Sequence, residues 1–320
     1  MTANSDIKIS VVIPVFNRAK TIEYALRSVL AQTYPAAEVI IVDDCSTDNT
    51  LEKLKTINDP RIVVIKQEKN QGAQAARNRG IKEAKYPWIA FHDSDDEWLP
   101  TRLEEGVKAL ASVNFEPFTL VHSNCIKYFE ATGKKELWEL PAMEGSSVEV
   151  LPKVLKEPGP MFQGMLTSRA ALEKIGLLDE KVPAYQEWET AIRLAQCCRF
   201  IHIKEPLFQY HFHGGEAISK GSNSDISGYH FNRLKHKEET VAILGKVFYD
   251  ENVRWNIERA FHRGAFPLAK QLIQDTYSPS SSAYIYLITL AGLGLSPEKI
   301  RHTFGLLKAP FRPFKRLLVK

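Results

Sequence analysis

Short apolar runs alternate with amphipathic segments through the first hundred residues, and this alternation strongly constrains the fold. The runs are rich in valine and isoleucine, as buried parallel strands are, and they occupy 7–16, 38–42, 61–67 and 88–92. Each gap between them contains a segment whose apolar residues follow helical spacing. Strands joined by helices form βαβ units, so we predict an α/β domain with a doubly wound, mostly parallel sheet.

An acidic cluster follows the fourth of these runs, in the segment WIAFHDSDDEWLP at 88–100. Its four carboxylates fall within five positions: Asp93, Asp95, Asp96 and Glu97. Like charges this close repel one another, and a fold tolerates them in water or around a cation. Carboxylate oxygens suit Mg²⁺ or Mn²⁺. The cluster therefore indicates either a solvated acidic turn or a metal site.

Polar residues also follow the first two runs, namely Asn17 and the pair Asp43 and Asp44. In doubly wound sheets ligands bind at the carboxyl ends of the strands, near the switch point. All three polar elements are predicted to lie at that edge, which favours a binding site over a solvated turn.

The rest of the chain is read more coarsely. We predict a helix at 101–111, a strand at 118–129 and an irregular loop rich in Pro and Gly at 141–165. A helix that begins acidic follows at 185–195, then a strand at 200–213 that is interrupted at Pro206. The pattern is helical from 214 onward. We therefore expect an α/β domain at 1–215 and a mainly helical region at 216–320.

Composition is that of an ordinary soluble protein, with 44% hydrophobic and 25% charged residues. The four cysteines lack zinc-site spacing, and the longest apolar stretch, 283–295, is too short to span a bilayer. The first ten residues are polar, so a cytoplasmic location is expected.

The last segment, 296–320, has seven Lys and Arg against one Glu, and its part at 308–318 adds bulky apolar residues. We expect either peripheral contact with an anionic membrane surface or a solvated basic terminus. Nucleic-acid binding is not expected, because no basic and aromatic platform occurs elsewhere.

Six motifs resemble the bacterial family-2 glycosyltransferases of the GT-A fold. In chain order they are VIPVFNR (12–18), SVLAQT (28–33), VDDCSTD (42–48), NQG with ARNRG (70–80), DSDD (93–96) and QEWE (186–189). They span two thirds of the chain, and nothing after 215 shares the resemblance. The resemblance implies a nucleotide-sugar donor, a divalent metal, inversion at the anomeric carbon and a role in surface polysaccharide synthesis.

For the donor, the resemblance implies that Pro14 and Phe16 line the base pocket, with Asn17 and Asp43 beside it. Asp44 would accept from a ring N–H, which suits uracil and favours a UDP-sugar. Arg77 would lie near the diphosphate. The alternatives are that Asp43 and Asp44 complement a helix dipole, and that Arg77 is a solvated helix residue.

For the metal, Mn²⁺ or Mg²⁺, the resemblance points to Asp95 as a ligand, with Asp93 near the metal or the ribose. His213, three residues after Tyr210, would reach the metal or the diphosphate, or would be structural. Asp96 and Glu97 are expected on the acceptor side, facing a glycan or lipid-linked acceptor.

The catalytic base of the family, usually an aspartate, corresponds to Glu187. It would take the proton from the acceptor hydroxyl as that oxygen attacks opposite the leaving diphosphate. Glu189 is the alternative base, in which case Glu187 would only cap the helix. Trp188 would stack on an acceptor sugar or pack in the core.

Three other functions fit parts of the pattern. The longer acid at Glu187 is compatible with an inactive sugar-nucleotide or glycan-binding protein. A nucleotidyltransferase would need a glycine-rich basic loop after the first strand, and 14–18 contains no glycine. A phosphoacceptor receiver domain would not have a whole βαβ unit before its acidic pair. Acceptor choice is expected to depend on 130–165 and the C-terminal third.

Overall fold

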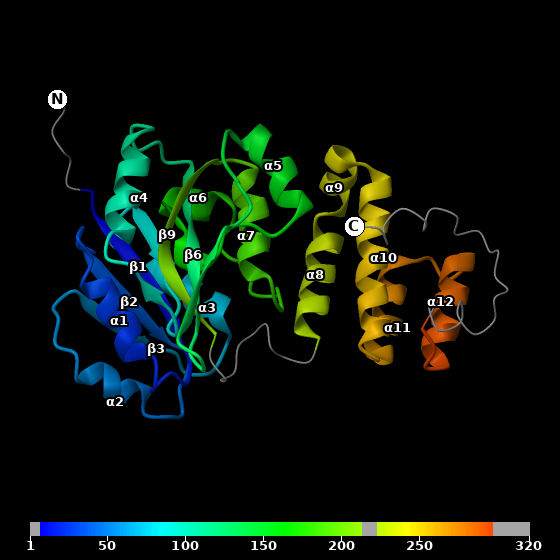
Figure 1. The fold of residues 1–320 in the computed structure, drawn as a ribbon, viewed down its shortest axis with the longest axis horizontal. Helices are drawn as coiled ribbons and strands as arrows, with labels where there is room; N and C mark the ends of the chain where they lie inside the picture. Colours follow the sequence, from blue (N-terminus) through cyan, green and yellow to red (C-terminus); the bar gives the residue numbers. More distant parts are fainter. Residues whose placement is uncertain (1–6, 213–222, 297–320) are drawn as a thin grey trace. The chain divides into compact units, whose positions relative to one another are not determined.

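The computed structural model describes residues 7–212 and 223–296 (Figure 1). The chain forms two compact units, Met1–Ala217 and Ile218–Lys320. The acidic cluster and every other candidate residue with described coordinates belong to the first unit.

The first unit is built on one sheet, which has nine strands within the described residues. Its order is β3-β2-β1-β4-β8-β6-β9-β5, and β7 pairs with β6. The strands are β1 (Ile9–Val15), β2 (Glu38–Asp43), β3 (Ile62–Lys66), β4 (Trp88–Phe91), β5 (Glu97–Trp98), β6 (Thr119–Phe129), β7 (Lys134–Trp138), β8 (Leu166–Ser168) and β9 (Arg199–Phe212).

The helices between the strands bury apolar faces against this sheet. They are α1 (Ile22–Leu30), α2 (Thr50–Lys55), α3 (Ala73–Glu83), α4 (Arg102–Ala111), α5 (Ser147–Lys156), α6 (Arg169–Lys174) and α7 (Gln186–Ala195), with a 3₁₀ turn, η1 (Phe162–Gly164). In α1 the predicted face is buried through Ile22, Leu26 and Val29. Each such side chain contributes about 1.5–3 kcal/mol of burial free energy.

Strand direction brings the carboxyl ends together at one edge. β1 pairs in parallel with β2 and β4, and β2 pairs in parallel with β3. β8 is antiparallel to both β4 and β6, and β9 is parallel to β6. Consequently β6 and β9 run in the same direction as the first four strands. The α/β sheet predicted from the sequence is confirmed, with antiparallel strands added to it.

A gap opens between β1 and β4 at this edge. Their pairing ends at Val12, whose carbonyl accepts from the His92 N–H at 3.1 Å. Pro14, two residues further on, faces the same side of β1, where an unpaired strand edge needs no donor. The proline therefore fits an inner strand because the sheet splits there, at the switch point.

Two of the expectations for the middle of the chain are wrong. Residues 141–165 contain a helix, α5, which begins with a capping box between Ser146 and Glu149. Pro152 lies inside it and has no N–H to donate to the Val148 carbonyl. Val148 is 81% exposed, so water can bond that carbonyl instead. β9 is also continuous through Pro206, because a register shift near Asn124 of β6 absorbs the irregularity.

The second unit is helical as far as it is described. It contains α8 (Ser224–Lys235), α9 (Lys237–Leu244), α10 (Lys246–His262), α11 (Phe266–Thr276) and α12 (Ser282–Gly292) around its own apolar core. This confirms the predicted C-terminal helical region. No helix in the described parts of the chain has both the length and the apolar character needed to cross a bilayer. The basic tail lies outside the described residues.

Candidate active site

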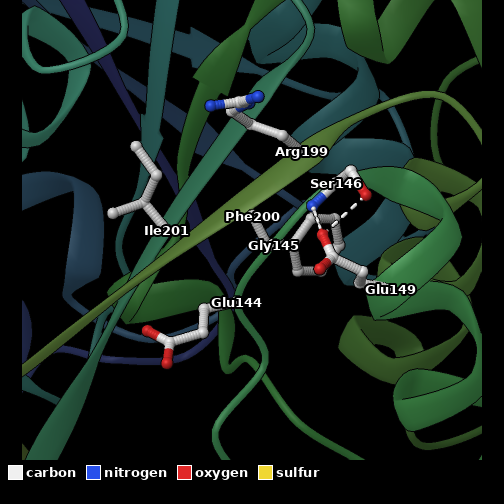
Figure 2. Close-up of a pocket in the computed structure, with 7 residues that line it drawn as sticks. All are labelled: Glu144, Gly145, Ser146, Glu149, Arg199, Phe200 and Ile201. Atoms are coloured by element: carbon white, nitrogen blue, oxygen red, sulfur yellow. Dashed lines mark hydrogen bonds between the residues drawn. The ribbon is translucent and has the colours of Figure 1, made fainter.

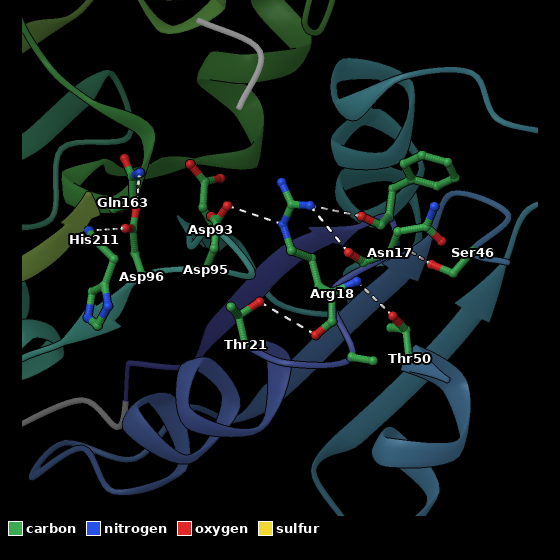
Figure 3. Close-up of polar contacts among 12 residues, drawn as sticks. Asn17, Arg18, Thr21, Ser46, Thr50, Asp93, Asp95, Asp96, Gln163 and His211 are labelled. Carbon is green, nitrogen blue, oxygen red and sulfur yellow. Dashed lines mark hydrogen bonds and ion pairs between the residues drawn. The ribbon is translucent and has the colours of Figure 1, made fainter. Parts of the chain in front are cut away.

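The turn after β1 is fastened to the loop after β2 by Asn17, which has a left-handed backbone with φ 52°. Its side-chain Oδ1 accepts from the backbone N–H of Thr47 at 2.8 Å and of Asp48 at 3.3 Å. Its own N–H donates to Ser46 Oγ at 2.9 Å (Figure 3). Asn17 therefore holds together the two loops that would surround a base.

The two acids at the end of β2 are both buried, but their hydrogen-bond partners differ. Asp43 is fully buried and accepts from the Ser46 N–H at 3.2 Å. Its carboxylate therefore supports its own turn and is not exposed to a nucleotide-sized ligand. Asp44 accepts from Gln67 Nε2 at 2.6 Å, Gln71 N at 2.8 Å and Gly72 N at 2.7 Å. A carboxylate has about four lone-pair sites, so Asp44 keeps the capacity for one further donor.

Pro14 and Phe16 also differ in exposure. Pro14 is buried in β1, whereas Phe16 is 39% exposed at the start of the turn. An exposed aromatic ring next to the opening between β1 and β4 is available for stacking, and Pro14 can contribute only to the floor.

The outward-facing half of the acidic cluster pairs with two arginines from different elements. Asp93 Oδ1 lies 2.7 Å from Arg77 Nη2 of α3, and Asp95 Oδ2 lies 3.1 Å from Arg18 Nε of the β1–α1 turn. Tyr24 of α1 donates its hydroxyl to the Asp95 carbonyl at 2.9 Å. Asp93 and Asp95 are both partly exposed. Both follow the carboxyl end of β4, the edge at which the sequence predicts a ligand site.

Asp96 is the inward-facing acid, and its expected place on the acceptor side is wrong. One oxygen accepts from the His211 N–H at 2.8 Å, and the other accepts from Gln163 Nε2 (Figure 3). Burial, with the nearby charges of Asp95 and Asp93, raises the pKa of Asp96 well above its usual value. Because it is buried and bonded on both oxygens, Asp96 anchors the loop.

Gln163 of η1 connects this anchor to the buried residues Trp98 and Arg102. Its carbonyl accepts from Trp98 Nε1 at 2.9 Å and from Arg102 Nε at 3.4 Å, while its side chain donates to Asp96. Arg102 is fully buried, and burial lowers its pKa to about 9. Its Nη2 donates to the Gly164 carbonyl at 2.7 Å. The buried cation thus fixes η1 under the acidic cluster.

His211 of β9 links Glu97 to the sheet. Its Nε2 lies 3.1 Å from Glu97 Oε2, and its Nδ1 lies 3.1 Å from Glu130 Oε1. The ring stacks on Tyr24 with centroids 5.0 Å apart. Glu97 is partly exposed, so it remains available to a ligand, although one of its oxygens is already engaged. His213 lies outside the described residues.

Glu187 lies at the start of α7, close enough to Arg77 and Asp93 to interact with both electrostatically. The helix is tied to α3 because Arg77 Nη1 donates to Gln186 Oε1 at 3.4 Å. Burial raises the pKa of Glu187, the proximity of Arg77 lowers it, and the negative charge of Asp93 raises it. Within the described residues no basic side chain forms an ion pair with Glu187. A half-buried carboxylate with a raised pKa is suited to accept a proton.

The two residues that follow Glu187 are both buried and engaged in contacts with the rest of the fold. Glu189 is fully buried and forms a two-pronged ion pair with Arg193, both contacts being 2.7 Å. The alternative base is therefore wrong. Trp188 is also fully buried and donates Nε1 to the Val154 carbonyl of α5 at 2.7 Å. It packs in the core and is not available to an acceptor sugar.

The carboxylates of this site could hold a metal ion only if phosphate oxygens of a substrate, or water, supplied the remaining ligands. No group of three His, Cys, Asp or Glu side chains suited to a metal occurs in residues 7–212 or 223–296. Asp93 and Asp95 offer hard oxygen ligands at a partly exposed position. Mg²⁺ in phosphate-transfer sites is commonly held by one or two carboxylates and completed by water and phosphate oxygens. The two carboxylates fit that incomplete set.

A hollow of about 420 Å³ lies elsewhere, at the opposite edge of the sheet (Figure 2). It is lined by Arg199 and Phe200 at the start of β9 and by residues before and within α5. The amino ends of β6 and β9 meet there, so none of the predicted donor or metal residues borders it.

The comparisons with known proteins agree with this geometry. The family model "Glycosyl transferase family 2" matches residues 10–176. The chain belongs to glycosyl transferase family 2. It is 30% identical over 240 residues to a putative colanic acid biosynthesis glycosyl transferase, WcaA, of Escherichia coli K12, covering 72% of this chain and 82% of that protein.

Other family members match over a shorter region. The chain is 42% identical over 99 residues to WfaP of Escherichia coli, a UDP-Glc:α-D-GlcNAc-diphosphoundecaprenol β-1,3-glucosyltransferase, covering 31% of this chain and 39% of that protein. Matches to the first relatives span 39% to 49% of their lengths.

A solved structure extends the likeness to the fold. Staphylococcus aureus TarS, residues 1–349, in complex with UDP-GlcNAc, aligns with a TM-score of 0.64 at 18% identity. The alignment covers 90% of this chain and 88% of that one. This likeness confirms the GT-A fold.

Several residues of the site were missed in the sequence. Arg18 was part of the first motif but was given no role, and Gln163 fell in the segment predicted to be irregular. The available signal for Arg18 was its place three residues after the carboxyl end of β1. Gln163 had no such signal, because its contact with Asp96 joins residues 67 positions apart.

Proposed function

We propose that the chain is a metal-dependent, inverting glycosyltransferase that moves a hexosyl or N-acetylhexosaminyl group from a UDP-sugar to a glycan or lipid-linked hydroxyl. The observation that carries the proposal is the meeting of Asp93, Arg77 and the start of α7 beside Asp95. Family membership supports the reaction class, and relatives named for colanic acid biosynthesis and for a diphosphoundecaprenol-linked sugar support a role in surface polysaccharide synthesis.

In this proposal residues 1–215 bind the donor and perform the reaction. Phe16 stacks on the base, Asp44 accepts one ring N–H with its remaining lone pair, and Arg77 binds the diphosphate. Asp95 and Asp93 hold Mn²⁺ or Mg²⁺, which neutralises the leaving diphosphate when bound. Glu97 borders the acceptor.

Glu187 is the general base. Its carboxylate takes the proton of the acceptor hydroxyl as that oxygen attacks the anomeric carbon, on the face opposite the diphosphate. The bond from the anomeric carbon to the diphosphate oxygen breaks in the same displacement, so the configuration inverts. Arg77 orders this arrangement because it contacts both Asp93 and Gln186, the residue next to the base.

The test is release of UDP from a panel of UDP-sugars with Mn²⁺ or Mg²⁺, measured with and without acceptor glycans. We expect divalent-dependent release that Asp95→Asn reduces by about 10²-fold or more, since charge stabilisation of the leaving group is lost. Arg27→Gln, an exposed change on α1 that disturbs only the pair with Glu23, is the matched control. Tight UDP binding without any turnover would instead support the inactive sugar-nucleotide-binding protein.

A further inference from the structure

Arg18 and Arg77 each neutralise one carboxylate of the acidic cluster, yet their surroundings are different. The Arg77 side chain is 5% exposed and is held by Asp93, by Gln74 Oε1 at 3.0 Å and by the face of Phe162, whose centroid lies 4.1 Å from Cζ. A cation fixed on three sides keeps its place when a ligand enters.

The Arg18 side chain is 24% exposed, and its contacts include one carboxylate and two backbone carbonyls. Its Nε lies 3.1 Å from Asp95 Oδ2, and its Nη1 lies 3.3 Å from the carbonyls of Phe16 and Asn17 in its own turn. The backbone of Arg18 is well fixed, because its N–H donates to Thr50 Oγ1 at 2.7 Å and its carbonyl accepts from the Ile22 N–H at 2.9 Å. The guanidinium thus extends from a fixed backbone to Asp95 (Figure 3).

Charge balance gives this difference a consequence. A divalent cation and the diphosphate of a nucleotide sugar carry equal and opposite formal charges, so they can enter together without changing the net charge of the site. A cation on Asp95, however, competes with the Arg18 guanidinium for the same carboxylate. A guanidinium displaced from a carboxylate is suited to the phosphate oxygens nearby, which it can bind with the same fork of donors.

We propose that Arg18 is an exchangeable counter-cation of Asp95: it neutralises the carboxylate until a divalent ion binds there, and then turns to the donor diphosphate. The inference rests on the proposed function, since it needs a metal and a nucleotide diphosphate at Asp95. It makes Arg18 a positioning residue for the carboxylate and a specificity residue for diphosphate-containing donors.

The experiment compares wild type, Arg18→Gln and Arg18→Lys, with Arg27→Gln as the matched control. Free Mn²⁺ is titrated by electron paramagnetic resonance without nucleotide, and UDP binding is measured by calorimetry at saturating Mn²⁺. For Arg18→Gln we expect about threefold tighter Mn²⁺ binding, because a competing ion pair is removed. We expect UDP to bind about tenfold more weakly, because a charge-assisted bond to phosphate is lost.

Arg18→Lys keeps the charge without the fork, so both values should lie between those of wild type and Arg18→Gln. A structural role, in which Arg18 only holds Asp95 in place, predicts weaker Mn²⁺ binding in Arg18→Gln and would overturn the proposal. Unchanged affinities for both ligands would also overturn it while leaving the proposed function intact. If wild type binds no UDP with Mn²⁺, the proposed function and this inference fall together.

Discussion

The acidic cluster and the first turn of α7 each contain both a buried carboxylate that supports the fold and at least one carboxylate that is partly exposed. In the cluster Asp96 is buried and accepts hydrogen bonds from two amide N–H groups, whereas its neighbour Asp95 is partly exposed. In α7 Glu189 is buried and forms an ion pair with Arg193, whereas Glu187, two residues earlier, is only half-buried.

The ligand-facing acids of the two regions differ in their partners. Asp93 and Asp95 each contact an arginine, while among the described residues Glu187 forms no ion pair. A carboxylate already balanced by a cation can exchange that cation for another one. A half-buried carboxylate without an ion pair has a raised pKa and can exchange a proton. The cluster is therefore suited to hold a metal and the helix to hold the base.

The largest expected effect separates Glu187 from Glu189. Glu187→Gln should reduce the rate of transfer by about 10³-fold, because the general base is lost, and should leave the melting temperature near that of wild type. Glu189→Gln should lower the free energy of unfolding by about 2–3 kcal/mol, because Arg193 loses a buried charged partner. Steady-state kinetics measures the transfer rate of both variants, and denaturant unfolding measures their free energy of unfolding. Stability loss in Glu187→Gln with full activity would reverse the assignment.

The next effect separates Asp96 from Asp95 by stability. Asp96→Ala should lower the free energy of unfolding by about 2 kcal/mol, because the His211 N–H and the Gln163 amide lose their acceptor. Asp95→Ala should change it by less than about 1 kcal/mol, since a partly exposed ion pair contributes little. Urea unfolding of both variants provides the measurement. Equal losses would show that the cluster acts as one structural unit.

The smallest effect is the pH dependence of the base. Burial raises the pKa of Glu187 above its ordinary 4.5, and the base must be ionised to work. Activity should therefore fall on the acid side with a midpoint above 4.5, by about tenfold per pH unit below it. The profile of kcat/KM against pH shows this limb, and Arg27→Gln should retain it. A limb that survives in the residual activity of Glu187→Gln belongs to another group.

The edge of the sheet at which these polar residues gather could be predicted, because it follows from local sequence. Asn17, Asp44 and Asp95 follow the ends of β1, β2 and β4 by two, one and four residues, and parallel strands bring their carboxyl ends to one edge. Helix α5 differs from the prediction, because the Pro and Gly residues of 141–165 indicate a loop whereas the capping box of Ser146 and Glu149 begins a helix there. Local signals conflicted there, and packing decided between them.

The sequence by itself determined the alternation of strands and helices, the family and the edge of the sheet where the acids gather. These depend on periodicity and on residues close together in the chain. Only the tertiary structure decided which acid of each pair is buried. That outcome depends on Gln163, His211 and Arg193, and for Asp96 the donors are 67 and 115 positions away in the chain. Carboxylates that are alike in the sequence differ in burial because distant segments supply the donors of Asp96, whereas Glu189 pairs with Arg193 four residues further along the same helix.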